Sequence, residues 1–231
     1  MIEEKLIDAK EITFDWLMDA GDKYGYTSHI DHFRELFSLM KVRTFLECGC
    51  GYSTKYFLDN CEKVISVEFK SEGTDLQWIN QCREMYKGIN NWQAIDYIGS
   101  SDFSWACGWQ CSNHTDPALI NGKYITEMSG FFDSLLKDNI VDVGFVDAGQ
   151  YIRGDMVELL LQKGVPIVCA HDTNSDDGTD NQLYGWFKIK TVKDYERINV
   201  PHAQGTTFWI HKDLKQVIEG LKQYVSNAKY R

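Results

Sequence analysis

The sequence predicts an α/β protein in which helices cover both faces of a mostly parallel sheet. Apolar runs of strand length alternate with stretches of helical periodicity over residues 25–211. Within this pattern, residues 43–69 read as strand, glycine turn, helix and strand, which is the order of a βαβ unit. An acid closes each strand, Glu47 the first and Glu68 the second. Strands that alternate with helices in this way are typical of a parallel sheet.

The first 40 residues read as an N-terminal helical cap made of two helices. Residues 3–20 are amphipathic, with apolar side chains that recur at helical spacing. A second helix is predicted from His29 to residue 40, because four apolar side chains share one of its faces. Thr27 or Ser28 can cap its first turn.

The remaining elements follow from short apolar runs and from helical spacing. Strands are predicted at residues 43–47, 63–69, 92–98, 141–147, 165–170, 193–199 and 205–211. Helices are predicted at residues 53–60, 75–87, 153–162 and 213–228. Residues 100–130 follow no regular period, so we expect an irregular insertion between the third and fourth strands.

The glycine turn after the first strand indicates a site for a nucleoside-containing cofactor. Gly49 and Gly51 let the main chain turn sharply and approach a ligand with no Cβ in the way. Glu68 follows Gly51 by 17 residues, near the distance at which a βαβ unit delivers a carboxylate to a ribose. No Gly-Lys-Ser/Thr follows, which excludes a Walker loop. Thr54 stands where a dinucleotide motif needs a third small residue. The alternative is an ordinary turn between a strand and a helix, in which the glycines serve only the backbone geometry.

Two segments resemble the class I S-adenosylmethionine-dependent methyltransferases, and in particular their small-molecule O-methyltransferase branch. The first is Glu47-Cys48-Gly49-Cys50-Gly51, which looks like motif I of that family. The second runs from Val143 through Asp147 to His171-Asp172 and is similar to the fourth strand, the next helix and the fifth strand of that branch. Gln150 departs from the usual histidine, and Val165 departs from the usual second glycine.

The resemblance implies a Rossmann-like class I methyltransferase fold. Such a fold has a mostly parallel seven-stranded sheet with helices on both faces and a C-terminal antiparallel strand. The implied cofactor is S-adenosyl-L-methionine, abbreviated SAM below. Residues 1–231 would then form a single methyltransferase-like domain, in which residues 100–130 serve as a lid.

The resemblance also assigns cofactor-binding residues. Glu47 would assist at the amino end of the cofactor, and Glu68 would accept hydrogen bonds from the ribose hydroxyls. The position of Ser101 and Asp102 after the third strand places them near the adenine, with a loop cap as the alternative. The residues expected to bind the cofactor are Glu47, Gly49, Gly51, Tyr52, Ser53, Glu68, Ser101 and Asp102.

Acceptor activation is expected at the ends of the fourth and fifth strands. His171 is the best general base by residue type, because the usual pKa of histidine lies near neutrality. A buried or capping histidine is the competing reading. Asp147 is the second catalytic candidate. Related O-methyltransferases use acids at these strand ends to hold a divalent cation, so Asp147 and Asp172 are candidate ligands for Mg²⁺, with Asn174 or Asp176 to complete the shell.

The insertion at residues 100–130 contains several aromatic residues, which favours a lid over the acceptor pocket. The alternative is that these residues only pack within a loop. Cys107, Cys111 and His114 lie in it as three soft residues that suit zinc. Their spacing is not that of a standard zinc finger or ribbon, and no fourth ligand is close.

Composition narrows the class of protein. A net charge of −10 argues against broad contact with a nucleic-acid backbone. No run approaches the roughly 18 apolar residues that span a bilayer. The first 30 residues lack the pattern of a signal peptide. Seven cysteines, an odd number, favour reduced thiols in a cytoplasmic protein.

Three functions remain open from the sequence. The first is SAM-dependent methyl transfer to an oxygen of a small-molecule acceptor. The second is a catalytically idle methyltransferase-like domain that binds a nucleoside cofactor or a protein partner. The third is a nicotinamide-dependent oxidoreductase, because a glycine turn and a ribose acid serve both cofactors. The N-terminal helices are candidate surfaces for a homo-oligomer.

Overall fold

A computed structural model describes residues 7–24, 27–71, 76–99, 123–149, 152–174 and 184–227. The strands are β1 (Thr44–Cys48), β2 (Lys63–Ser71), β3 (Trp92–Gly99), β4 (Val143–Val146), β5 (Ile167–His171), β6 (Tyr195–Val200) and β7 (Thr206–His211). The α-helices are α1 (Phe14–Tyr24), α2 (Ile30–Leu39), α3 (Thr54–Asn60), α4 (Gln77–Met85), α6 (Lys123–Asp138), α7 (Arg153–Gln162) and α9 (Lys215–Ser226). Two short 3₁₀ turns, η1 (Ala9–Glu11) and η5 (Trp186–Lys188), complete the described elements.

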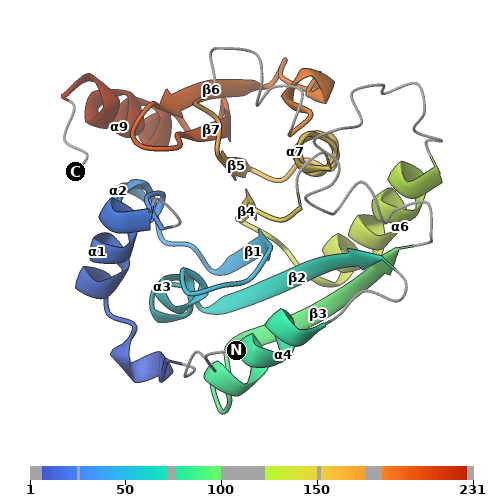
Figure 1. Cartoon of the computed structure of the whole chain (residues 1–231). Coiled ribbons are helices and arrows are strands. Elements are labelled where there is room, and N and C mark those ends of the chain that lie inside the picture. Colours follow the sequence, from blue (N-terminus) through green and yellow to red (C-terminus); the bar gives the residue numbers. More distant parts are fainter. Residues whose placement is uncertain are drawn as a thin grey trace.

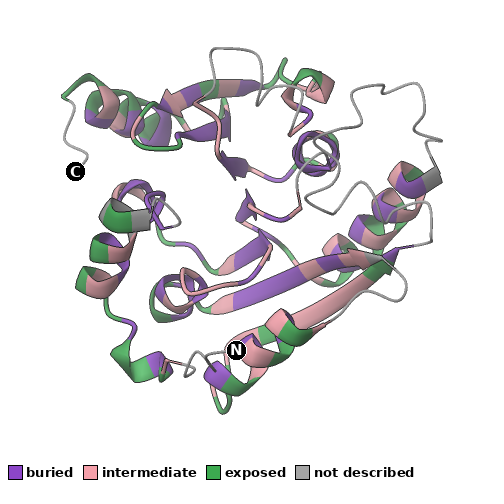
Figure 2. Ribbon diagram, in the orientation of Figure 1, coloured by how far each residue is buried: buried purple, intermediate pink, exposed green. Residues whose placement is uncertain are grey.

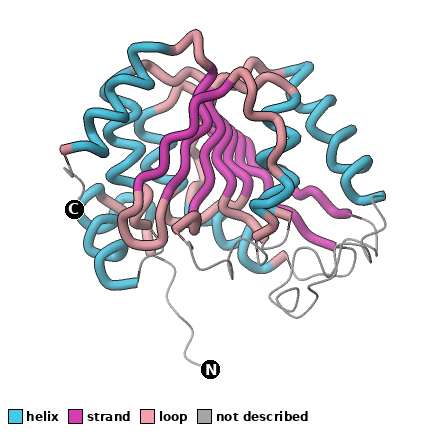
Figure 3. The backbone as a smooth tube through the Cα atoms, turned by 90° about the horizontal axis from the view of Figure 1, so that it is seen from above, coloured by secondary structure: helices cyan, strands magenta, loops and turns pink. Residues whose placement is uncertain are grey.

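The strands form one seven-stranded sheet in the order β3-β2-β1-β4-β5-β7-β6 (Figure 1). Neighbouring strands from β3 to β5 are parallel, and β7 is antiparallel to both β5 and β6. Figure 3 shows helices on both sides of this sheet. The predicted fold class is therefore confirmed, including its C-terminal antiparallel strand.

Two apolar cores hold the helices to the sheet, one on each face. Strand side chains alternate between them: Phe45 and Phe145 belong to the core under α1, α2, α3, α4 and α9, whereas Leu46 and Val146 belong to the core under α6 and α7. A strand buried on both faces reads as a continuous apolar run, which is why the central strands were visible in the sequence. Buried residues accordingly concentrate in the middle of the sheet (Figure 2).

The predicted single helix over residues 3–20 is wrong in one respect, because the chain breaks it at Ile12 and Thr13. Residues 9–11 form a 3₁₀ turn, whose start is capped by the Asp8 side chain. The Thr13 hydroxyl then accepts a hydrogen bond from the Trp16 amide at 3.2 Å, so that a new helix starts at this point.

The expected irregular insertion is wrong over its last residues, where α6 begins at Lys123. Tyr124, Met128, Phe132 and Leu135 are buried at intervals of one helical turn and pack against β2 and α7. Ser129 and Gly130, in the middle of this stretch, are weak helix formers. Tertiary packing of the apolar stripe outweighs their weak helix propensity. Residues 100–122 lie outside the described residues.

Candidate functional site

The order of the sheet reverses between β1 and β4, because β2 and β3 follow on one side and β5 on the other. Open α/β sheets bind ligands at such a point, outside the carboxyl ends of the strands. Residues Cys48–Tyr52 follow β1, Asp147 follows β4, and β5 ends at His171. The predicted site residues after these three strands therefore share one end of the sheet.

The turn after β1 requires glycine at position 49. Gly49 has φ +96°, and its amide donates to the Val67 carbonyl at 2.8 Å. A Cβ at this position would lie 2.9 Å from the Asp147 carbonyl oxygen, closer than packed atoms tolerate. The absence of a side chain at Gly49 therefore lets the end of β1 pack closely against the end of β4.

Gly51 serves a different purpose, since a Cβ there would meet, among the described residues, only the Trp78 ring, at 3.9 Å. The described part of the chain thus leaves space beside Gly51. Two aromatic side chains hold the main chain around it: Trp78 Nε1 donates to the Cys50 carbonyl at 2.8 Å, and the Tyr86 hydroxyl donates to the Gly51 carbonyl at 2.6 Å. Tyr52 packs edge-on against Trp78.

Glu47 is completely buried at the end of β1. Its Oε1 accepts from the hydroxyls of Thr54, at 2.7 Å, and of Ser66, at 2.5 Å, while Oε2 has no hydrogen-bond partner. Thr54 in turn accepts from the Gly51 amide at 2.9 Å, so one hydroxyl links the acid to the turn. Burial raises the pKa of Glu47 to about 8, against the effect of both hydroxyl donors.

This raised pKa predicts how stability depends on pH. The folded chain keeps the Glu47 proton until about pH 8, whereas the unfolded chain loses it near 4.5. The folded state binds more protons in this window, so the free energy of unfolding should fall as pH rises, on the order of 1.4 kcal/mol per pH unit. Urea denaturation from about pH 5 to about pH 9 measures this slope. Glu47→Gln should flatten it, and an unchanged slope in that variant would contradict the assignment.

Glu68 lies beside the glycine turn. Its Oε2 is 3.9 Å from the Cys50 thiol, and its Oε1 pairs with Lys70 Nζ at 3.2 Å. The carboxylate is partly accessible, with 12% of the side chain exposed. The two halves of the predicted cofactor site are therefore adjacent in space. Ser53 is half-buried in the turn before α3, and Ser101 and Asp102 lie outside the described residues.

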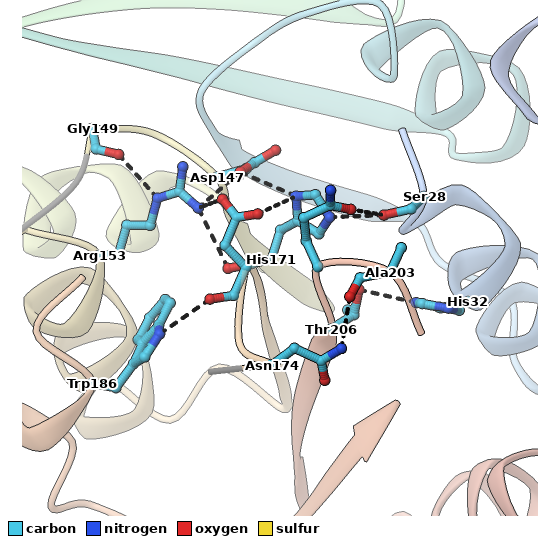
Figure 4. A network of polar contacts seen from close by, with 12 residues as sticks. Ser28, His32, Asp147, Gly149, Arg153, His171, Asn174, Trp186, Ala203 and Thr206 are labelled. Carbon is cyan, nitrogen blue, oxygen red and sulfur yellow. Dashed lines mark hydrogen bonds and ion pairs between the residues drawn. The ribbon is translucent and has the colours of Figure 1, made fainter. Parts of the chain in front are cut away.

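Arg153, in the first turn of α7, connects the ends of β4 and β5 (Figure 4). Its Nη1 lies 3.1 Å from Asp147 Oδ1 and 2.7 Å from Asp172 Oδ2, and its Nε donates to the Gly149 carbonyl at 3.0 Å. The Tyr184 ring lies against the guanidinium, 4.5 Å from its carbon. A protein cation thus contacts both acids predicted to bind Mg²⁺.

Asp172 itself has a left-handed backbone, with φ +60°. Trp186 Nε1 donates to its carbonyl at 3.3 Å, and Arg153 holds its carboxylate. Non-glycine residues in this conformation are costly and cluster at functional sites. Asn174, the other proposed ligand, donates its amide to the Ala203 carbonyl at 2.7 Å, and Asp176 lies outside the described residues.

His171 is 3% exposed, and its two ring nitrogens have different neighbours. Nε2 lies 3.0 Å from the Ser28 hydroxyl. Nδ1 lies 3.6 Å from Asp147 Oδ1 and 3.6 Å from Asp172 Oδ1. Burial alone would lower the pKa of His171, but the two carboxylates raise it above the usual value. Burial would raise the pKa of Asp147, but Arg153 and His171 lower it to about 2.

Sequence reasoning missed four residues that shape this site. Thr54 and Trp78 fix the glycine turn, Arg153 neutralises the acids, and Ser28 binds His171. The position of Arg153 could have been noticed in the sequence. A cation in the first turn of a helix is unfavourable for the helix dipole, so its presence there indicates a nearby anion. Trp78 and Ser28 carry no local signal, since each acts on a distant segment, whereas the contacts of Thr54 with Gly51 and Glu47 are local in sequence.

No protein-family model matches the sequence, and no curated protein matches it. Several solved structures share its fold. The SAH-bound methyltransferase PaMTH1 of Podospora anserina is 16% identical, with 89% of this chain and 88% of that chain covered and a TM-score of 0.51. An O-methyltransferase of Bacillus cereus in complex with SAH is 12% identical, with coverage of 91% and 93% and a TM-score of 0.50. TomG, an O-methyltransferase of Streptomyces achromogenes solved with SAM and involved in tomaymycin synthesis, is also 12% identical, with coverage of 91% and 92% and a TM-score of 0.50.

These likenesses show the fold, which is that of the SAM-dependent methyltransferases. Unrelated activities can share one fold, so the function has to be argued from the site. Among the described residues, no helix is long and apolar enough to cross a membrane.

Proposed function

We propose that this protein transfers the methyl group of SAM to an oxygen of a small-molecule acceptor. The observation that carries the proposal is the approach of Glu68 to the glycine turn, with 3.9 Å between its carboxylate and the Cys50 thiol. One cofactor molecule can therefore reach both groups. The structures of the same fold that were solved with SAH or SAM support this choice of cofactor.

Each end of the cofactor has a proposed partner. Glu68 accepts hydrogen bonds from the ribose hydroxyls, and the space beside Gly51 admits the methionine portion. Glu47 would assist at the amino end through Oε2, which no described residue binds, and it would give up its proton as the cation arrives, because its pKa of about 8 keeps it neutral in the free protein. Gly49, Tyr52 and Ser53 form the rest of this turn, and Ser101 and Asp102 remain proposed for the adenine.

Charge also favours SAM over an anionic cofactor. SAM carries positive charge on its sulfur and its amine, and two acids, Glu68 in β2 and Asp147 after β4, lie on the two sides of β1. Holding the donor and the acceptor in line can supply several kcal/mol of the barrier to displacement at the methyl group.

Asp147 and His171 are the proposed acceptor-activating pair. Asp147 is the more accessible of the two, with 23% of its side chain exposed, and so it can accept a hydrogen bond from an acceptor hydroxyl. His171 Nδ1 lies 3.6 Å behind its carboxylate and would take up the proton. The acids Asp147 and Asp172 already contact Arg153, so Mg²⁺ would have to displace that cation to bind both of them. No step in this scheme uses the ion, and Mg²⁺ binding by this pair stays a prediction.

This pair predicts a pH profile. The raised pKa of His171 keeps the imidazole protonated above pH 6.5, and only the neutral form can accept a proton. Turnover should therefore rise with pH through a midpoint above 6.5. Asp147→Asn should move that midpoint downward as well as slow the reaction, because it removes the carboxylate that favours the charged ring. A midpoint that does not move in this variant would contradict the role of Asp147.

Calorimetry with SAM, SAH and NAD tests the cofactor. We expect binding of SAM and SAH and no measurable binding of NAD. A preference for NAD would replace the proposal with an oxidoreductase. Consumption of SAM in a screen of sugars, phenols and short peptides then identifies the acceptor class.

One observation favours a second function, the catalytically idle domain. His171 is buried, and Ser28 occupies its Nε2. SAM binding without methyl transfer to any acceptor in the screen would support that alternative. The single-domain organisation, the lid formed by residues 100–130 and a homo-oligomer remain proposals of the same kind.

A further inference from the structure

His29 stands out among the described residues because it is completely buried and neither ring nitrogen has a hydrogen-bond partner. Its ring lies against three aromatic neighbours, Phe33, Phe57 and Phe145, and against His171, with 4.7 Å between the two imidazole centroids. Buried polar groups without partners are rare and call for an explanation such as an ion. A neutral imidazole has one ring nitrogen with a lone pair, and no described residue donates a hydrogen bond to either nitrogen of His29.

The hydrogen bonds of His171 decide which of its ring nitrogens carries a lone pair. That nitrogen is Nδ1, which faces Asp147. Ser28 donates its single hydroxyl proton to Gln204 Oε1, at 3.3 Å. The hydrogen bond between Ser28 and His171 Nε2 therefore needs the proton on Nε2. When the ring is neutral, Nδ1 is therefore an acceptor that faces Asp147 Oδ1 at 3.6 Å. In that form a metal cation can lie between the two atoms, in place of the proton that the carboxylates otherwise hold on the ring.

The separation of these two atoms suits a metal better than a proton. Nδ1 and Asp147 Oδ1 are 3.6 Å apart, which is longer than a hydrogen bond. Two ligands that lie about 2.0–2.1 Å from a tetrahedral zinc ion are separated by about 3.3 Å. One ligand atom each from His29, Asp147 and His171 lie within 4.8 Å of one another, so small side-chain movements would close the shell.

We propose that His29, Asp147 and His171 bind a divalent transition metal of the zinc class. Two imidazoles and one carboxylate suit such borderline ions, whereas Mg²⁺ prefers oxygen ligands alone. This ligand set differs from the Asp147 and Asp172 pair, because it leaves Asp172 to Arg153, 2.7 Å away, and it recruits His29 from the segment before α2. Asp147 Oδ1 lies 3.1 Å from Arg153 Nη1, so metal binding would lengthen that one contact while Asp172 keeps the guanidinium in place.

The remaining coordination position faces the accessible side of the site. His29 and His171 are buried, while 23% of the Asp147 side chain is exposed, so an ion and a further ligand can enter from the Asp147 side. Three protein ligands with one open position is the arrangement of catalytic zinc sites. The hydrogen bond between Ser28 and His171 Nε2 would hold the His171 ring in the orientation that a metal ligand needs. The proposal does not require methyl transfer, but it uses the His171 Nδ1 to which the proposed function gives the acceptor proton, so a bound metal and proton uptake by that nitrogen exclude each other.

Titration of the chelator-treated full chain with Co²⁺ tests the site. Tetrahedral Co²⁺ gives visible d–d absorption, and we expect saturation near one ion per chain and displacement by Zn²⁺. Zn²⁺ should also raise the melting temperature of the wild-type protein. His29→Gln and Asp147→Asn should each weaken Co²⁺ binding at least about tenfold and remove the Zn²⁺-dependent thermal shift.

His211→Gln is the matched control, because His211 is a partly exposed histidine at the end of β7 that neighbours Asp213. It should bind Co²⁺ as the wild-type protein does. Circular dichroism before metal addition shows whether His29→Gln folds, and Asp147→Asn provides a second test at a more accessible residue. A wild-type chain that binds neither ion, or variants that bind as tightly as the wild type, would overturn the proposal. A response to Mg²⁺ alone would overturn it as well and would favour the two acids.

Discussion

Glu68→Ala is expected to weaken SAM binding by about 10- to 100-fold, measured by calorimetry. Hydrogen bonds to a charged group are worth about 1.5–3 kcal/mol, and each 1.4 kcal/mol is tenfold in affinity. The variant should change the free energy of unfolding by less than about 1 kcal/mol, because the pair of Glu68 with Lys70 is partly exposed. The loss should therefore appear in binding and not in folding.

Two further variants sharpen this test. Glu68→Gln keeps the shape of the side chain and one acceptor oxygen, so its loss should be smaller than that of the alanine variant. Glu62→Gln is the matched control, since Glu62 is an exposed acid that pairs with Lys41. An unchanged SAM affinity in Glu68→Ala would mean that the ribose is held elsewhere, and the proposed cofactor site would fail.

The positions of the strands and the glycine turn could be anticipated because their signals are local in sequence. Buried parallel strands are continuous apolar runs, and Gly49, Gly51 and Glu68 all lie within one βαβ unit. Short segments fix such features before any long-range contact forms. The break at Thr13 and the start of α6 were missed, because in both places a side-chain contact decides between two weak local preferences.

The environment of the acids could not be anticipated, because it depends on contacts between distant segments. Arg153 reaches Asp172, which follows β5, from the first turn of α7, and Ser28 reaches His171 across 143 positions of the chain. The sequence indicated a histidine and acids at two strand ends but not the guanidinium between the acids. Ionisation depends on the nearest charge, so residue type alone could not assign a metal, a base or a structural ion pair to these positions.

The two glycines of the turn should respond to alanine in opposite ways. Gly49→Ala places a side chain at φ +96° and 2.9 Å from a backbone oxygen, and neither problem can be relieved by rotating a side chain. We expect a loss of about 2–4 kcal/mol in the free energy of unfolding, measured by urea denaturation. Gly51→Ala meets only the Trp78 ring at 3.9 Å, so stability should change by less than about 1 kcal/mol.

SAM binding should respond strongly to Gly51→Ala even though stability does not, because the added methyl group enters the space proposed for the cofactor. SAM affinity of Gly51→Ala should fall at least about tenfold in a chain of normal stability. Gly88→Ala is the control that separates backbone strain from the steric contact at Gly49. Gly88 also has a left-handed backbone, with φ +85°, but no described atom lies within 4 Å of the position of its Cβ. Its smaller loss of stability would measure backbone strain alone, and the excess at Gly49 would measure the contact with Asp147. Tight SAM binding by Gly51→Ala would mean that the cofactor does not lie against the turn.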